Sequence, residues 1–174
     1  LQSVVIEANI TEIPDACFAY QRKLTSVTIP NSVTRIGSDA FCLCPITSVT
    51  LPESLEFIGA RAFSYAGLTE ITIPGKVKEI GDAAFNECKI ATVDLPASIE
   101  SVHATAFVWE AATTVICRAE AVPATPNTDE FNNSWPPFYK LKKGSCKLKV
   151  PAASLDAYKA AWGKYFGEEN IESL

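Results

Sequence analysis

Apolar side chains recur at fixed positions along most of the chain, with a period of 22 residues. A weaker copy of 23 residues precedes the regular ones, and a further copy begins near Ala112 and degrades after it. A unit of this length cannot bury its own apolar face, so the repeat predicts stacked units that share one continuous core. The four regular copies start at Leu24, Ile46, Leu68 and Ile90.

The first half of each copy has the spacing L-x-x-L-x-L, and its last three positions alternate between apolar and polar, as in Val27-Thr28-Ile29. Alternation with period two predicts a short strand that directs two apolar side chains inward. A proline, which cannot donate to a strand ladder, follows every strand. We therefore expect parallel strands stacked about 4.8 Å apart, which end at Pro30, Pro52, Pro74 and Pro96.

The second half of each copy reads V-x-x-I, then usually glycine, then Ala-Phe. The glycines are expected to permit either a positive φ or a close approach of two backbones. The small alanine allows a short turn or helix to lie close, with a column of stacked phenylalanine rings beneath it. The glycines are Gly37, Gly59 and Gly81, and the rings are Phe41, Phe63, Phe85 and Phe107.

The segment LTSVTIPNSVTRIGSDAF and its three echoes resemble the leucine-rich repeat, and more closely its BspA-like subfamily. The C-terminal CKLKVPAASLDAYKAAWGKYFGEENI also resembles the strand-plus-helix end of such proteins. The resemblance implies a right-handed leucine-rich-repeat solenoid of about six repeats, with a parallel β-sheet on its concave face and a C-terminal strand–helix cap. It also implies an exported or surface-attached bacterial protein that binds an extracellular protein or glycan, host matrix included.

We interpret residues 1–174 as a single leucine-rich-repeat domain. Val115 and Leu148 hold corresponding strand positions 33 residues apart, so about eleven residues are inserted in the last repeat. In the cap, Ser154 is expected to cap a helix that ends at Gly167. The outward-facing Lys147 and Lys149 are expected to discourage further strand pairing. The predicted repeats are 1–23, 24–45, 46–67, 68–89, 90–111 and 112–144, and the cap is 145–174.

Composition narrows the class of protein. Hydrophobic residues make up 48% of the chain and charged residues 20%, which suits a packed core. The net charge of −5 argues against general nucleic-acid binding, and no apolar run approaches the ~20 residues of a membrane span. The chain has no methionine and no leader, and Leu1 already occupies a repeat position. We therefore expect a processed protein or fragment, with an export signal and further repeats or a cap upstream.

The six cysteines include a Cys-x-Cys pair, but the repeat gives them a structural interpretation. Cys44 and Cys88 share a position with Ala66, and Cys17 shares one with Ala40, so all three are expected to be buried free thiols. Cys44 and Cys88 lie two repeats apart, ~10 Å along the stack, which exceeds the ~7 Å limit for a disulfide. Cys42 holds a variable position and is expected to be partly exposed.

No catalytic, metal or cofactor site is expected, because zinc would need four convergent ligands and a catalytic base would need a nucleophile or an acid held beside it, and the repeat pattern fixes no carboxylate there. His103 is the only histidine, and it replaces the repeat glycine, where we expect it to tolerate a left-handed φ. The chain is therefore expected not to be an enzyme.

Two columns of polar residues face outward along the predicted sheet. Ser26, Ser48, Glu70 and Thr92 form one, and Thr28, Thr50, Thr72 and Asp94 form the other. These residues, several of them β-branched threonines, could simply favour strands and keep the face soluble, or they could form a binding surface for protein or glycan. An ice-binding lattice is disfavoured because the Ser/Glu column interrupts it. The candidate binding residues are Thr28, Thr50, Thr72 and Asp94.

The inserted segment NNSWPPFYKLKKG, residues 132–144, groups aromatic and basic side chains. The first 112 residues carry 7 basic and 13 acidic side chains, and the remainder carries 8 and 7, so basic charge gathers at the C-terminal end. The aromatic residues could cap the open end of the stack or contact a ligand, whereas nucleic-acid stacking is disfavoured by the overall acidity. The candidate contact residues are Trp135, Phe138, Tyr139 and Lys140, with Lys142 and Lys143 beside them.

These features together predict a non-catalytic extracellular binding or adhesion module. The alternative is a structural spacer that holds another domain of a larger surface protein away from a surface.

Overall fold

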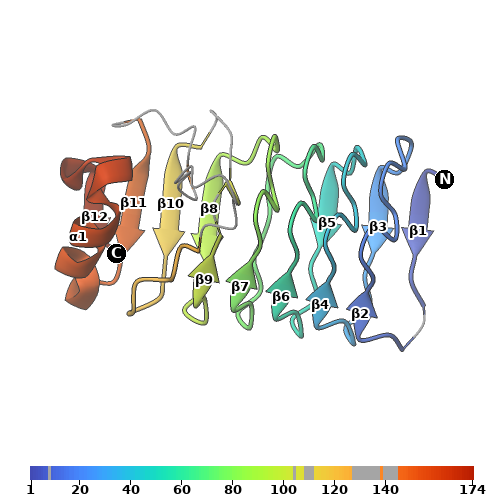
Figure 1. Cartoon of the computed structure of the whole chain (residues 1–174), viewed down its shortest axis with the longest axis horizontal. Helices are drawn as coiled ribbons and strands as arrows, with labels where there is room; N and C mark the ends of the chain where they lie inside the picture. Colours follow the sequence, from blue (N-terminus) through green and yellow to red (C-terminus); the bar gives the residue numbers. More distant parts are fainter. Residues whose placement is uncertain (8, 104, 108–111, 127–137, 139–144) are drawn as a thin grey trace.

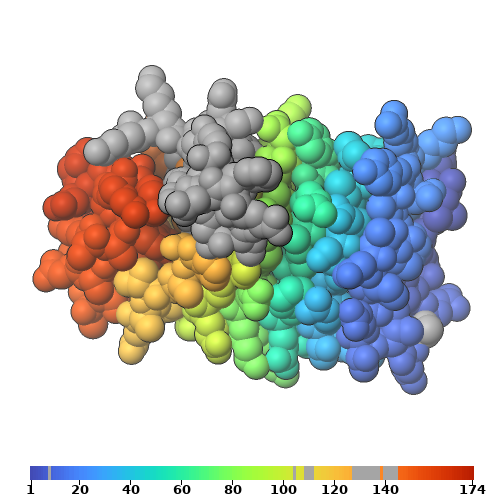
Figure 2. All heavy atoms as spheres, viewed as in Figure 1, coloured from blue at the N-terminus to red at the C-terminus, as the bar shows by residue number. Residues whose placement is uncertain are grey.

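In the computed structural model the chain is an elongated solenoid whose repeats stack side by side in sequence order, from the N-terminus to a C-terminal helix (Figures 1 and 2). The structure describes residues 1–7, 9–103, 105–107, 112–126, 138 and 145–174. The predicted architecture of stacked repeats with parallel strands and a C-terminal helical cap is confirmed.

The strands of the first half-repeats form the main sheet of the solenoid, in two parts that are parallel throughout. One part joins β1 (Ser3–Val5), β3 (Ser26–Thr28) and β5 (Ser48–Thr50). The other joins β8 (Thr92–Leu95), β10 (Thr114–Cys117), β11 (Lys147–Val150) and β12 (Ile171–Ser173). Val115 pairs with Leu148, which confirms the register predicted across the insertion.

A second parallel sheet runs along the other side of the coil, and the sequence analysis did not predict it (Figure 1). Its strands hold only two residues each, too few to show an alternating pattern. Their second residue is buried in every strand, so the last position of V-x-x-I, which is isoleucine except at Val102, anchors this sheet to the core. The strands are β2 (Glu12–Ile13), β4 (Arg35–Ile36), β6 (Phe57–Ile58), β7 (Glu79–Ile80) and β9 (Ser101–Val102).

The Ala-Phe segment forms turns whose backbone N–H groups donate hydrogen bonds to the next repeat. The N–H groups of Asp39, Phe41 and Leu43 donate to the carbonyls of Ala60, Ala62 and Ser64 at 2.7–2.9 Å. Asp39 and Leu43 reach these partners with positive φ values of 57° and 59°. The same pattern recurs in neighbouring repeats, so a third hydrogen-bond ladder links the coils.

The repeat glycines serve close backbone approach rather than positive φ. A Cβ atom on Gly59 would lie 2.6 Å from the backbone carbon of Gly37, and one on Gly81 would lie 2.6 Å from the nitrogen of Ala60. The residue two positions later takes the left-handed conformation instead, as at Arg61. The predicted left-handed φ of His103 is likewise wrong, because among the described residues the positive φ of that repeat lies at Thr105.

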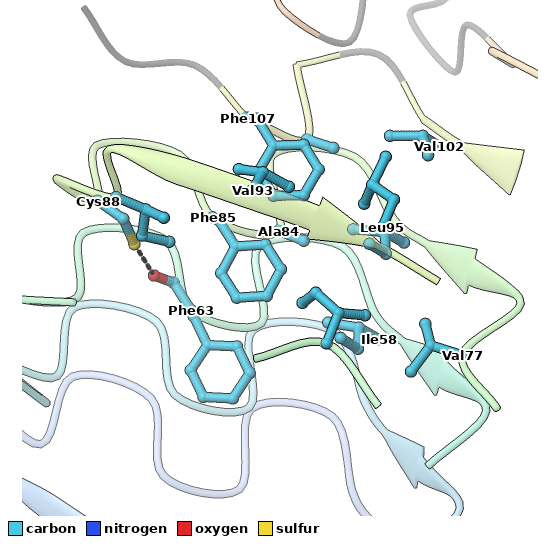
Figure 3. Packing of buried hydrophobic residues seen from close by; sticks show 14 of the residues in the cluster. Ile58, Phe63, Val77, Ala84, Phe85, Cys88, Val93, Leu95, Val102 and Phe107 are labelled. Atoms are coloured by element: carbon cyan, nitrogen blue, oxygen red, sulfur yellow. Dashed lines mark hydrogen bonds between the residues drawn. The ribbon is translucent and has the colours of Figure 1, made fainter. Parts of the chain in front are cut away.

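Stacked phenylalanine rings run through the core, as predicted (Figure 3 shows three of them). Neighbouring ring centroids lie 5.3–5.9 Å apart, with interplanar angles of 5–15°. The inserted segment supplies the last ring of the column, so the insertion continues the repeat at this position. The column consists of Phe18, Phe41, Phe63, Phe85, Phe107 and Phe138.

The cap covers the C-terminal end of this column. It comprises η1 (Ala152–Ser154), α1 (Leu155–Phe166) and η2 (Glu168–Asn170), followed by β12. Helix α1 buries Tyr158, Trp162 and Phe166, and the last two meet Phe138 edge-on at 5.6 and 5.2 Å. The helix ends at Gly167, where φ is 84°, as predicted.

Two expectations about the cap are wrong. Ser154 does not cap the helix through its side chain, because its hydroxyl donates to the carbonyl of Glu120. Lys147 and Lys149 do not end the sheet, because β12 pairs with β11 and brings Glu172 within 3.5 Å of both ammonium groups.

The structure revises the exposure of two of the six free thiols. Cys44 and Cys88 are buried, as predicted, and donate to the carbonyls of Phe18 and Phe63 at 3.0 and 3.3 Å (Figure 3 shows the second bond). Cys17 is exposed; within the described residues the strands of its repeat, β1 and β2, pair only with β3 and β4 of the following repeat. Cys42 is buried, at 7% exposure, rather than partly exposed.

Candidate ligand-binding groove

A shallow, open groove of about 700 Å³ lies on the main sheet, across four consecutive repeats. We call it the main-sheet groove. Its polar side chains alternate with inward-facing apolar ones, because successive residues of a strand point to opposite faces. It is lined by Ser26, Val27, Ser48, Val49, Thr50, Leu51, Glu53, Glu70, Ile71, Thr72, Pro74, Thr92 and Asp94.

The groove lies where the main sheet is interrupted. The ladder of backbone hydrogen bonds continues on both sides of the interruption. The backbone N–H of Thr47 donates to the carbonyl of Thr25 at 3.3 Å, and the backbone N–H of Thr113 donates to the carbonyl of Ala91 at 2.9 Å. Residues 69–73, the interrupted segment, exchange no backbone hydrogen bond with any described residue and form no strand. The expectation of one continuous sheet is therefore wrong at this repeat, and the sheet divides into its three-stranded and four-stranded parts.

The interruption also uncovers apolar side chains of the core column. Val49 and Ile71 are half-buried, whereas Val93 and Val115, at the same repeat position beyond the interruption, are fully buried. The floor of the groove therefore combines hydroxyl groups, backbone polar groups and partly exposed aliphatic carbon.

All charged residues that line the groove are acidic: Glu53, Glu70 and Asp94. Asp94 is neutralised by Arg118, whose Nε and Nη2 atoms lie 2.7 Å from the two carboxylate oxygens. This bidentate contact raises the pKa of the Arg118 guanidinium further above its ordinary value. Glu53 and Glu70 form no ion pair with any residue that the structure describes, so the groove carries uncompensated negative charge.

A smaller hollow of about 420 Å³ adjoins the groove at its Arg118 end. It shares Ile71, Thr72 and Asp94 with the groove, so the two surfaces are continuous. The Asp94–Arg118 pair therefore stands at the border between the acidic floor and the rim.

The structure brings three of the four candidate strand residues together. Thr50, Thr72 and Asp94 line the groove, whereas Thr28 is exposed on β3 outside its lining. Glu53 and Glu70 also line the groove and were not among the predicted binding residues. Glu70 could have been found, because it is the only charged residue in a column of serines and threonines.

The candidate residues of the insertion have a different outcome. Trp135, Tyr139 and Lys140 lie outside the described residues, as do Lys142 and Lys143. Phe138 is 2% exposed and continues the phenylalanine column, so its ring is not available to a ligand. For this residue the capping interpretation replaces the ligand-contact one.

His103 has an acidic neighbour that the sequence analysis did not anticipate. Its Nε2 atom lies 3.0 Å from Oε1 of Glu79. His103 directly follows β9, and Glu79 begins the neighbouring strand β7. The nearby Ser101 hydroxyl has no hydrogen-bond partner, so this pair activates no nucleophile through a described contact.

The described part of the chain offers neither a metal site nor a membrane-spanning helix. No group of three or more His, Cys, Asp or Glu side chains there is arranged to hold a metal ion. None of the helices in these residues has the length and hydrophobicity that crossing a membrane requires.

Comparison with protein families and solved structures gives a consistent result. The family model for the BspA type leucine-rich repeat region matches residues 1–113, in six copies. A leucine-rich repeat protein from Eubacterium ventriosum ATCC 27560 is 21% identical, with a TM-score of 0.58 over 88% of this chain. One from Bacteroides ovatus ATCC 8483 is 18% identical, with a TM-score of 0.50 over the whole chain.

These structural matches concern the fold alone. The chain spans 33% of the first solved protein and 61% of the second, so both are longer than the sequence compared. A search of curated proteins found no match.

Proposed function

Because the chain belongs to the BspA-type leucine-rich-repeat family, we propose that it is a non-catalytic recognition domain whose main-sheet groove binds an extracellular protein or glycan. Repeat domains of this kind present extended surfaces that bind partners. The observation that carries the proposal is the groove itself, which places outward-facing polar side chains from four repeats in one open hollow.

The shape of the groove favours an elongated ligand. It spans four repeats and is partly open to solvent, whereas sites for small molecules enclose most of the ligand surface. Its floor offers hydroxyl groups from Ser48, Thr50, Thr72 and Thr92, which can donate or accept hydrogen bonds. An enzymatic role has no comparable support among the described residues.

The proposed setting is the surface of a bacterial cell or the space outside it. BspA-type leucine-rich-repeat proteins are typically surface-associated, and both solved relatives come from bacteria. In that setting, adhesion to a host matrix protein or to a glycan is the role that we propose.

A binding array of matrix proteins and glycans tests the proposal, with the wild-type chain beside two variants. Thr50→Tyr places a bulky side chain in the groove, and Ala160→Tyr makes a similar change on an exposed position of α1. We expect Thr50→Tyr to lose binding and Ala160→Tyr to retain it. Equal binding by both variants would contradict the groove as the site, and no binding by the wild type would favour a structural spacer.

A further inference from the structure

We infer that the main-sheet groove accepts an extended peptide segment that carries lysine or arginine side chains. This inference rests on the proposed function and names the class of ligand for the same groove. It follows from three properties of the described residues: the charge of the lining, the unpaired backbone of the interrupted segment, and the alternation of apolar and polar side chains.

The charge of the lining selects the sign of the ligand. Glu53, Glu70 and Asp94 line the groove, and no lysine, arginine or histidine does. Arg118 neutralises Asp94 from the rim, which leaves Glu53 and Glu70 without a cationic partner among the described residues. Complementary charges steer association and exclude wrong partners, so this groove favours a cationic segment and disfavours sulfated or carboxylated glycans.

The backbone of the interrupted segment selects a peptide over a neutral glycan. Ile71, Thr72 and Ile73 are β-branched and therefore favour a strand, yet residues 69–73 form none. A conflict between local sequence and final structure is expected at functional sites. The N–H and C=O groups of this segment lack backbone partners among the described residues. A peptide that crosses the segment carries a donor and an acceptor in each peptide unit and can satisfy such groups.

The alternation along the groove fits the side chains of such a peptide. Val49 and Ile71 expose aliphatic carbon on the floor, and Glu53 and Glu70 lie among the same lining residues. Successive side chains of an extended peptide point to opposite sides. A peptide in which basic residues alternate with aliphatic or hydroxyl-bearing ones can therefore place both kinds against matching surfaces.

The test uses fluorescent pools of short peptides and the complete chain. In one pool Lys or Arg alternates with Val or Thr, and in the second pool Glu replaces the basic residues. A neutral oligosaccharide serves as the third probe. Glu53→Gln/Glu70→Gln removes the uncompensated groove charge, and Glu7→Gln/Glu100→Gln makes the same change in charge at exposed positions outside the groove.

We expect the basic pool to bind, the acidic pool not to bind, and added salt to weaken binding. Loss of two exposed ion pairs should weaken the binding of the basic pool by about threefold to thirtyfold in Glu53→Gln/Glu70→Gln. Glu7→Gln/Glu100→Gln should bind as the wild type does. Hydrogen exchange at the amides of residues 69–73 should slow when the basic pool is bound, because a bound backbone gives those amides partners.

Other outcomes would overturn the inference and leave the proposed function standing. One is binding of the neutral oligosaccharide that Thr50→Tyr abolishes and Glu53→Gln/Glu70→Gln does not affect. Equal binding of the basic pool by both charge variants would place the peptide elsewhere, and failure of that pool to bind at all would reject the peptide assignment. The proposed function fails separately, if Thr50→Tyr does not weaken the binding of the ligands found on the array.

Discussion

At the scale of single residues, one repeat position carries different chemistry according to what covers it. Cys17 and Ala40 occupy equivalent positions, yet the thiol is exposed and the alanine is fully buried. Ala40 has a neighbouring repeat on each side, whereas Cys17 belongs to the first repeat of the described stack. Alignment of the repeats therefore predicts the size of a side chain better than its exposure.

The thiols provide a direct measurement of this difference. We expect a thiol-reactive dye to label Cys17 rapidly in the native protein, because it is the exposed cysteine, and to label the other five only after denaturation. Burial raises the pKa of Cys44 and Cys117, which further lowers their reactive thiolate fraction. Cys17→Ser should abolish native labelling. Rapid labelling of a second native thiol would show that a buried position is open.

Cys88 should make stability depend on alkaline pH. Burial raises the pKa of its thiol from an ordinary value near 9 to about 12, so the folded protein holds this proton more tightly than the unfolded chain. The resulting stability is present below pH 9 and is lost as pH rises toward 12, by up to ~4 kcal/mol. Denaturant melts across this window should show a shallower decline for Cys88→Ala, which Ala66 shows the position to accept. Parallel declines for the two proteins would contradict the prediction.

At the scale of elements, the phenylalanine column joins the repeats through the core. Phe63 is fully buried between Phe41 and Phe85, with ring centroids 5.3 and 5.5 Å away. Phe63→Ala should lower the free energy of unfolding by ~3–5 kcal/mol. Thr50→Ala, on the exposed face of β5, should change it by less than ~0.5 kcal/mol. Denaturant melts compare the two, and the reverse ranking would mean that the two faces are wrongly assigned.

The interrupted segment should be visible in hydrogen exchange of the free protein. The amides of residues 69–73 have no backbone acceptor among the described residues, so they should exchange much faster than those of β10 (Thr114–Cys117), which is paired on both sides. The strand β3 (Ser26–Thr28) provides a second comparison, because it is paired on both sides. Protection of residues 69–73 equal to that of β3 would show a continuous ladder in solution.

The sequence predicted the elements whose pattern extends over several residues. The register from Val115 to Leu148 followed from alternation alone and is confirmed. The two-residue strands of the second sheet were missed, because a single V-x-x-I step does not distinguish a strand from a turn. The interrupted segment could not be predicted either, because Ile71, Thr72 and Ile73 favour the strand that they do not form.

The candidate site shows the same limit. The sequence identified Thr50, Thr72 and Asp94, because strand side chains alternate between the two faces and these three fall on the outward one. The uncompensated charge of Glu53 and Glu70 depends on which cations come near, and Arg118 reaches Asp94 from the next repeat. That pairing joins residues 24 positions apart, and the spacing of the repeats does not specify it.

At the scale of the whole molecule, the insertion connects a repetitive stack to a cap of different structure. Phe138 stacks on Phe107 at 5.9 Å with a 7° angle between the rings, which continues the geometry of the repeats. Its other contacts, with Trp162 and Phe166, are edge-on at 64° and 62°. One residue thus ends the parallel stacking and begins the packing of the helix. For Trp135, which lies outside the described residues, the alanine variant separates the two predicted roles: capping implies a loss of ~3 kcal/mol or more in stability, and ligand contact implies near-normal melting with weakened binding.

Phe138→Ala should therefore uncouple the cap from the stack. Loss of a buried aromatic ring is expected to cost ~3–5 kcal/mol, and the cost should fall on the interface, because repeat proteins are held together by contacts between neighbours. We expect the circular dichroism of α1 to be lost at lower denaturant than hydrogen-exchange protection in β4 and β6, so that one transition becomes two.

The matched control is Phe57→Ala on the second sheet. The Phe57 ring is half-buried, and its centroid lies 3.8 Å from the Cζ atom of the Arg35 guanidinium. This variant should lower stability less and keep one transition. Normal melting of Phe138→Ala with weakened ligand binding would instead return this ring to the binding surface.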